Sequence, residues 1–214
     1  VVGLLAVLTM GSAATPRPVV LQLPRLALSL IILQRDRRQT NGTSLLWVLP
    51  LLATVWVNLH GSFVFLFVLI GSYGLGAIID EWRSRRPIRS WRQAQELATG
   101  APLRLLTVGI LSIVGAAINP FGAQMLVYPF ETIATGLGAS YEIDEWRAVD
   151  PTAPRYWPFL GMLGLSVFAA IRSRDRLRSV DPILLVVFGL LGLTAYRNGP
   201  VFAVVAFPIT ATLL

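Results

Sequence analysis

Long apolar runs separated by short polar connectors dominate the chain. The longest run extends from Leu45 to Ile79 and is broken by a polar stretch at 58–62. As one α-helix, these residues would measure roughly 50 Å, far more than the ~30 Å hydrocarbon thickness of a bilayer. The run must therefore turn, and 58–62, with an amide, an imidazole, a glycine and a hydroxyl, predicts the turn. Because such groups are costly in hydrocarbon, we expect the turn at a membrane surface.

The other apolar runs predict further membrane helices, with Pro16 and Pro18 separating the first two because proline removes a backbone donor. These runs are 1–14, 19–33, 102–118, 157–171, 182–196 and 201–214. The sequence therefore predicts an all-α fold, a polytopic transmembrane helix bundle of about seven membrane segments with a broken helical hairpin at 45–79. We expect one transmembrane domain over 1–214, as part of a longer chain, because both ends of the sequence lie within apolar runs.

Composition and charge then orient the bundle. With 55% apolar and 14% charged residues, the chain departs from an ordinary soluble domain, and it has no cysteine for disulfides or thiolate chemistry. Thirteen of its 18 arginines lie in the connectors 34–44, 80–104 and 172–181, which predicts that these connectors are cytoplasmic. Since the arginines cluster between apolar runs, they favour a membrane setting, and no nucleic-acid partner is expected. The turn at 58–62 and the loop 119–156, whose net charge is −3, then lie outside.

This topology gathers the polar residues of several connectors on the outer face. Arginine forks suit phosphate oxygens, and carboxylates suit divalent cations such as Mg²⁺ or Mn²⁺. The candidate metal ligands are Glu142, Asp144 and Glu145. The candidate substrate-binding residues are Arg17, Asn58, His60, Asn119, Tyr128, Arg197 and Asn198.

Each candidate also has a structural interpretation. His60 precedes a glycine and could bond to the backbone of its own turn, and the acidic cluster could be a solvated loop face. The segments Asn119-Pro120 and Asn198-Gly199-Pro200 are typical of helix ends, while Arg17 and Arg197 could be interfacial anchors. Arg25 lies inside an apolar run, where it could snorkel toward the Arg17 end or face a polar cavity.

Several strings in the chain carry a family resemblance. They are similar to the second half of bacterial multi-pass proteins related to the GT-C glycosyltransferases, which include the protein mannosyltransferases and the aminoarabinose transferase of lipid A. The similarity runs from about Thr15 to the end of the chain. The strings are TPRPVV, WVNLHGSFVF, INPFGAQMLVYP, YEIDEWRAVDP and AYRNGPVFAVVAFP.

This resemblance implies an enzyme of the bacterial inner membrane that passes a sugar from a polyprenyl-phosphate donor to an acceptor at the outer face. The catalytic acid of that superfamily lies in the first outer loop, but the corresponding connector here, 15–18, has no acid. The general base is therefore expected upstream of Val1, and no catalytic residue is assigned. The resemblance leaves Arg17, His60 and Arg197 as phosphate or hydroxyl contacts, and the acidic cluster of 142–145 as metal or sugar contacts.

Two other functions stay open at this point. A transporter or lipid flippase would use Arg25, the broken run 45–79 and the glycines at 71–76 as a substrate path. A non-catalytic membrane subunit would dock a protein partner on the outer loop, where the apolar stretch 121–130 could lie against a partner or in the membrane interface.

Overall fold

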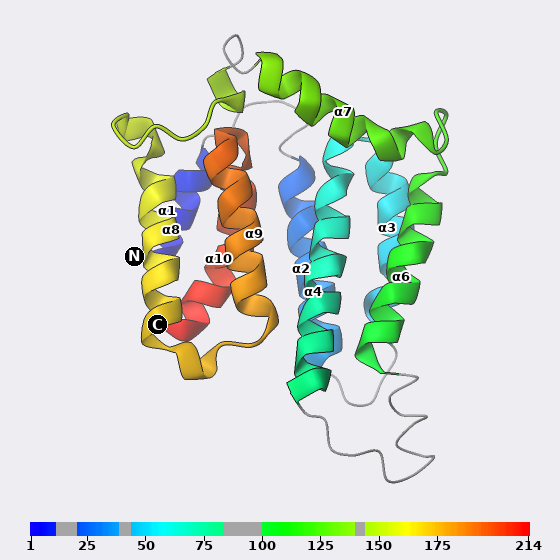
Figure 1. Ribbon diagram of the computed structural model, residues 1–214, viewed down its shortest axis with the longest axis horizontal. Coiled ribbons are helices and arrows are strands. Elements are labelled where there is room, and N and C mark those ends of the chain that lie inside the picture. Colours follow the sequence, from blue (N-terminus) through cyan, green and yellow to red (C-terminus); the bar gives the residue numbers. More distant parts are fainter. Residues whose placement is uncertain (12–20, 39–43, 84–99, 140–143) are drawn as a thin grey trace. The chain divides into compact units, whose positions relative to one another are not determined.

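The computed structural model describes residues 1–11, 21–38, 44–83, 100–139 and 144–214. These described residues form helices and no strand, which confirms the predicted all-α class (Figure 1). The helices form two compact units, one of residues 1–27 and 128–214 and the other of residues 28–127. Within the described ranges, the helical stretch Gly61–Arg83 alone is long and apolar enough to cross a membrane. Leu45–Val57, Ala101–Ala116 and Val180–Thr194 are shorter apolar helical stretches.

The first unit is built around α10 (Gly199–Leu213). This helix packs against α1 (Val2–Met10), α8 (Trp157–Arg172) and α9 (Val180–Thr194), so apolar residues on most of its circumference are buried (Figure 1). A helix that is apolar on all sides is expected at the centre of a bundle. A buried hydrogen bond of 2.8 Å between the hydroxyls of Ser166 and Thr210 also joins α8 to α10.

The second unit contains the predicted break. Helix α3 (Val48–Val57) ends just before the polar stretch, and the 3-10 turn η4 (Gly61–Phe63) leads into α4 (Val64–Arg83). Helix α6 (Ala101–Ala116) packs against both α3 and α4. The predicted break at 58–62 is therefore present, but α3 and α4 pack mainly against α6 and not against one another as in a helical hairpin.

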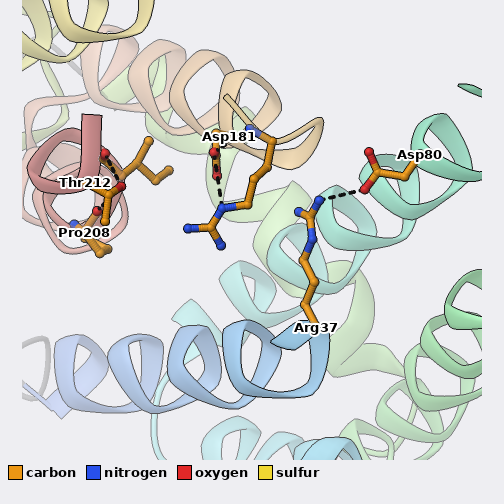
Figure 2. A network of polar contacts seen from close by, with 7 residues as sticks. Arg37, Asp80, Asp181, Pro208 and Thr212 are labelled. Carbon is orange, nitrogen blue, oxygen red and sulfur yellow. Dashed lines mark hydrogen bonds and ion pairs between the residues drawn. The ribbon is translucent and has the colours of Figure 1, made fainter. Parts of the chain in front are cut away.

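Polar contacts show which helix ends lie together in the second unit. Arg37 forms a 2.7 Å ion pair with Asp80 at the end of α4 (Figure 2), and Arg104 at the start of α6 lies 3.3 Å from Asp36. At the other end, Asn58 after α3 donates to the carbonyl of Ile118 after α6. Successive helices of this unit therefore run in opposite directions, and their connectors lie alternately at its two ends.

The first unit has the same alternation. The Ser173 hydroxyl, after α8, donates to the carbonyl of Leu213 at the end of α10. At the opposite end, the backbone N–H of Tyr196, between α9 and α10, donates to the carbonyl of Arg147, which precedes α8. The polar connectors therefore lie at the two ends of the unit, and apolar helix surfaces lie between them.

Two predicted connectors contain helix instead. Helix α2 (Gln22–Arg38) continues through the arginines that we assigned to the connector 34–44, because helix C-termini favour cations and Asp36 and Arg37 find partners there. The predicted outer loop 119–156 contains α7 (Gln124–Ala139). Its apolar residues recur at intervals of three and four, a helical spacing that the prediction of a loop overlooked.

Arg25 lies in the first turns of α2. Its guanidinium donates a 2.8 Å hydrogen bond to the carbonyl of Leu21, one turn toward the N-terminal end of the helix. Of the two alternatives for Arg25, this bond agrees in direction with snorkelling toward the Arg17 end, and it satisfies part of the guanidinium within its own helix.

Candidate functional site

His60 caps the short helix that follows the break in the hairpin. Its Nδ1 accepts the backbone N–H of Ser62 at 3.1 Å and lies 2.7 Å from the Ser62 hydroxyl. The indole N–H of the buried Trp56 donates to that hydroxyl at 3.1 Å. If the hydroxyl hydrogen points to the imidazole, Nδ1 accepts both bonds and Nε2 carries the proton in the neutral ring. The arrangement supports the turn interpretation of His60, because its Nδ1 serves the local backbone.

The two asparagines at the same end of the second unit also bond to the backbone. Asn58 donates through Nδ2 to the carbonyls of Thr54 and Ile118, at 2.8 and 2.9 Å. The Asn119 side chain bridges the carbonyls of Ala116 and Gly122 and accepts an N–H through Oδ1. Both side chains therefore fix the end of α6 and the turn after α3.

Arg197 lies in the 3-10 turn η8 (Tyr196–Asn198) between α9 and α10. Its guanidinium carbon stands 4.3 Å from the centre of the Trp146 ring, in the turn η5 (Asp144–Trp146). The backbone holds these turns together, since the N–H of Val149 donates to the carbonyl of Leu193 and that of Tyr196 to the carbonyl of Arg147. The contact therefore joins two connectors that are distant in the sequence.

The pKa of the Arg197 guanidinium is lowered by its partial burial. Loss of water around the guanidinium lowers its pKa, and the nearby Glu145 carboxylate and Tyr128 phenol oppose this shift. The arginine stays charged at neutral pH, because its pKa in water lies far above 7. We call Tyr128, Glu145, Trp146 and Arg197 the arginine site; three of its four members were predicted, and Trp146 was missed.

A second arginine stacks on an aromatic ring beside this site. Arg155 lies 4.6 Å from the centre of the ring of Tyr156, which is buried and meets the Tyr196 ring edge to face at 4.6 Å. The Tyr196 hydroxyl donates to the carbonyl of Arg155. The aromatic residues flanking both arginines in the strings EWR, PRYW and YRN were the sequence signal for these contacts, and the predictions left it unused.

Asn198 has a structural role in the turn η8. Its Nδ2 donates to the carbonyl of Leu191 at 3.0 Å, which ties η8 to the last turn of α9. It thus supports the position of the preceding Arg197, and this bond agrees with the helix-end interpretation of 198–200.

Three candidates fall wholly or partly outside the described residues. Arg17 and Glu142 lie outside them, and for Asp144 the structure describes the backbone alone. Among the described side chains, no three from histidine, aspartate and glutamate are grouped so that they could hold a metal ion. Asn58, His60 and Asn119 belong to the second unit, whereas Tyr128, Glu145, Arg197 and Asn198 belong to the first.

Comparisons with known proteins add nothing to these observations: no family model, curated protein or solved structure matches the chain.

Proposed function

We propose that this chain is a multi-pass protein of the bacterial inner membrane that works as a GT-C-like glycosyltransferase on a polyprenyl-phosphate-linked sugar at the outer face. The observation that carries the proposal is the arginine site. There, a partly buried guanidinium rests on an indole ring beside a carboxylate, at the helix ends of an apolar bundle. Such an arrangement suits a ligand that combines a phosphate with a sugar and is anchored by a lipid tail.

The helix lengths support a membrane setting. The turn η6 (Pro154–Tyr156) continues directly into α8, and η8 continues into α10. Each combined element measures roughly 30 Å including its polar turn, so Arg155 and Arg197 in these turns would lie at the border of a hydrocarbon layer ~30 Å thick. The stretch Gly61–Arg83 is longer than either of these.

The outward surfaces of the helices support the same setting. Large apolar side chains such as Leu106 and Val114 on α6, and Val186 and Leu190 on α9, are exposed. In water, contiguous apolar surface of this kind is unfavourable, whereas lipid tails cover it at no cost. We therefore assign the lateral helix surfaces to lipid and the arginine-rich connectors to the cytoplasmic side.

Within the arginine site, each residue type has a task that fits its chemistry. Arg197 would hold the donor phosphate through its fork of N–H groups, and Trp146 keeps the fork in place by stacking. Glu145 and Tyr128 would bond to sugar hydroxyls. The Glu145 side chain is the one described member of the expected Mg²⁺ or Mn²⁺ cluster, so the proposal assigns no step to a metal.

The test is binding of a short polyprenyl phosphate, such as farnesyl phosphate, to the chain in nanodiscs, with farnesol as the uncharged reference. Loss of a charged hydrogen bond predicts that Arg197→Ala weakens farnesyl phosphate binding roughly 10- to 100-fold. Farnesol binding should not change. Arg35→Ala, at an exposed arginine of α2, is the matched control and should bind like the parent.

A second, milder variant tests the same site in case Arg197→Ala fails to fold. Trp146→Leu removes the aromatic surface but leaves the charge, and we expect weaker farnesyl phosphate binding by about 3-fold, since exposed cation–π contacts are worth ~0.5–1 kcal/mol. Unchanged binding in folded Arg197→Ala protein would refute the assignment of the phosphate site. Exchange of a bound lipid across liposomes would then favour the transporter alternative.

Cysteine labelling tests the orientation, because the chain has no cysteine of its own. In the turn at 58–62, Leu59 is the suitable position for a probe, because half of its surface is exposed whereas Ser62 is buried. We expect an impermeant maleimide to label Leu59→Cys and Ala148→Cys in intact cells, and Asp175→Cys only after permeabilisation. Labelling of Asp175→Cys in intact cells would reverse the orientation.

A further inference from the structure

The connector between α8 and α9 is rich in arginine, and hydrogen bonds fix its backbone conformation. Four of the seven residues from Arg172 to Arg178 are arginines; two of them lie in the 3-10 turn η7 (Arg174–Arg176) and the other two flank it. Backbone hydrogen bonds hold the conformation of this segment. The N–H of Ser173 donates to the carbonyl of Ala169, that of Arg176 to the carbonyl of Ser173 and that of Leu177 to the carbonyl of Arg174. The Ser173 hydroxyl also ties the segment to the last residue of α10.

One arginine of the segment is used within the fold. The backbone N–H of Arg178 donates to the buried Asp181 carboxylate at 2.9 Å, and its guanidinium Nε lies 3.7 Å from the same oxygen (Figure 2). Asp181 therefore neutralises Arg178 and holds the start of α9. The other three arginines are left to face outward.

Arg172, Arg174 and Arg176 are exposed, and we call them the basic turn. Arg174 is paired only loosely, at 3.9 Å from Asp175, with 83% of its side chain accessible. Within the part of the chain that the structure describes, Arg172 and Arg176 form no ion pair. The turn therefore keeps a positive surface charge that the described acidic side chains do not neutralise.

Apolar side chains adjoin these charges on the last turns of α8. Ile171 is 71% exposed and Phe168 is 59% exposed, directly before the basic turn in the chain. A border between apolar side chains and arginines matches the border between acyl chains and headgroups of a bilayer. A nucleic acid would match the charges alone, and would leave Ile171 and Phe168 in water.

We propose that the basic turn binds the phosphodiester headgroups of anionic phospholipids, with Ile171 and Phe168 in the adjoining acyl region. This inference rests on the membrane topology proposed above, but it does not depend on sugar transfer, because the basic turn lies at the opposite end of α8 from the arginine site. Its ligand is a bulk lipid, and its consequence is a preference of the protein for negatively charged membrane.

The experiment measures lipid binding by native mass spectrometry of the 214-residue chain in a neutral detergent, with equal amounts of phosphatidylglycerol and phosphatidylcholine. Each arginine near a membrane surface contributes about a 5-fold preference, so the Arg172→Gln/Arg174→Gln/Arg176→Gln variant should lose at least ~10-fold of the preference for phosphatidylglycerol. The same three positions changed to lysine should keep most of it.

A variant that is expected to raise the lipid preference distinguishes a change in the site from a loss of folding. Asp175→Asn removes the one exposed acid of η7 and should raise the preference for phosphatidylglycerol by up to ~5-fold. Inorganic phosphate at millimolar concentration should not displace the lipid. Displacement by phosphate would indicate a site for the free anion and would contradict the proposal.

Other outcomes overturn the proposal separately from the proposed function. An equal preference in the parent and the triple glutamine variant would refute the lipid site and leave the arginine site untouched. If the protein binds a short single-stranded DNA through the three arginines and shows no lipid preference, the partner of the basic turn is a nucleic acid and the lipid site is refuted. Failure of the parent chain to enter neutral liposomes would instead refute the membrane topology itself.

Discussion

Gly115 of α6 lies directly against the carbonyl oxygen of Pro50 in α3. A Cβ atom placed on Gly115 would stand 2.7 Å from that oxygen and 2.7 Å from the hydroxyl oxygen of Thr54. Both distances are well below van der Waals contact, and the first partner is backbone that cannot rotate away. The close approach of α3 and α6 in the second unit therefore depends on the missing side chain, as is common between helices in membranes.

Gly115→Ala should therefore destabilise the protein by about 2 kcal/mol, because overpacking exceeds the gain in helix propensity. Gly109→Ala in the same helix is the matched control: its Cβ would meet Ile70 at an ordinary 3.5 Å. We expect that control to be neutral or more stable by up to ~1 kcal/mol. Unfolding by SDS in mixed micelles compares the two, and equal stabilities would contradict the tight contact.

His60→Ala should lower stability by about 1 kcal/mol, because the backbone N–H of Ser62 loses the acceptor that caps η4. His60→Asn should restore most of this loss, since asparagine is among the best capping residues. The same unfolding measurement applies. If both variants are as stable as the parent and both lose farnesyl phosphate binding, His60 contacts the ligand and the capping account is wrong.

The hydroxyls of Ser166 and Thr210 should be coupled across α8 and α10. A double-mutant cycle with Ser166→Ala and Thr210→Val should give a coupling of roughly 0.5–1.5 kcal/mol, the range found for hydrogen bonds between membrane helices. Thr212→Val provides the control. The Thr212 hydroxyl bonds to carbonyls of its own helix, so its coupling to Ser166→Ala should be near zero.

Asp150 should titrate below the usual aspartate pKa of 3.8. The hydroxyl and backbone N–H of Thr152 both donate to its carboxylate, and these bonds lower its pKa. Because the folded pKa is depressed, the turn is favoured above the unfolded pKa and loses this contribution as pH falls through the folded value. The Thr152 amide shift in an NMR acid titration reports the change.

Thr152→Val is the control for that titration, because it removes the hydroxyl donor and should move the Asp150 pKa back toward 3.8. An Asp150 carboxylate that titrates identically in the parent and in Thr152→Val would show that the hydroxyl bond does not form in solution.

Much of the fold was predictable from local sequence. The break at 58–62 followed from the length of the apolar run and from the polar residues within it, and the structure has it between α3 and α4. The ends of most helices follow from prolines, glycines and arginine-rich connectors. The extension of α2 to Arg38 was missed because hydropathy separates apolar from polar residues, whereas a helix continues through polar residues that find partners.

The candidate site was only partly predictable. The sequence supplied Tyr128, Glu145 and Arg197 as residue types in predicted outer connectors, but nothing in it pairs Arg197 with Trp146. It also could not separate these residues from Asn58 and Asn119, whose side chains bond to nearby backbone.

The sequence by itself thus determined the helical class, the break at 58–62 and the polar ends of the helices, because these depend on hydropathy and backbone preferences along short segments. The tertiary structure alone decided that Arg197 stacks on Trp146 and that Gly115 admits the backbone of Pro50. Such pairs join residues of different helices and turns, so their geometry depends on how the helices pack, which no local pattern specifies.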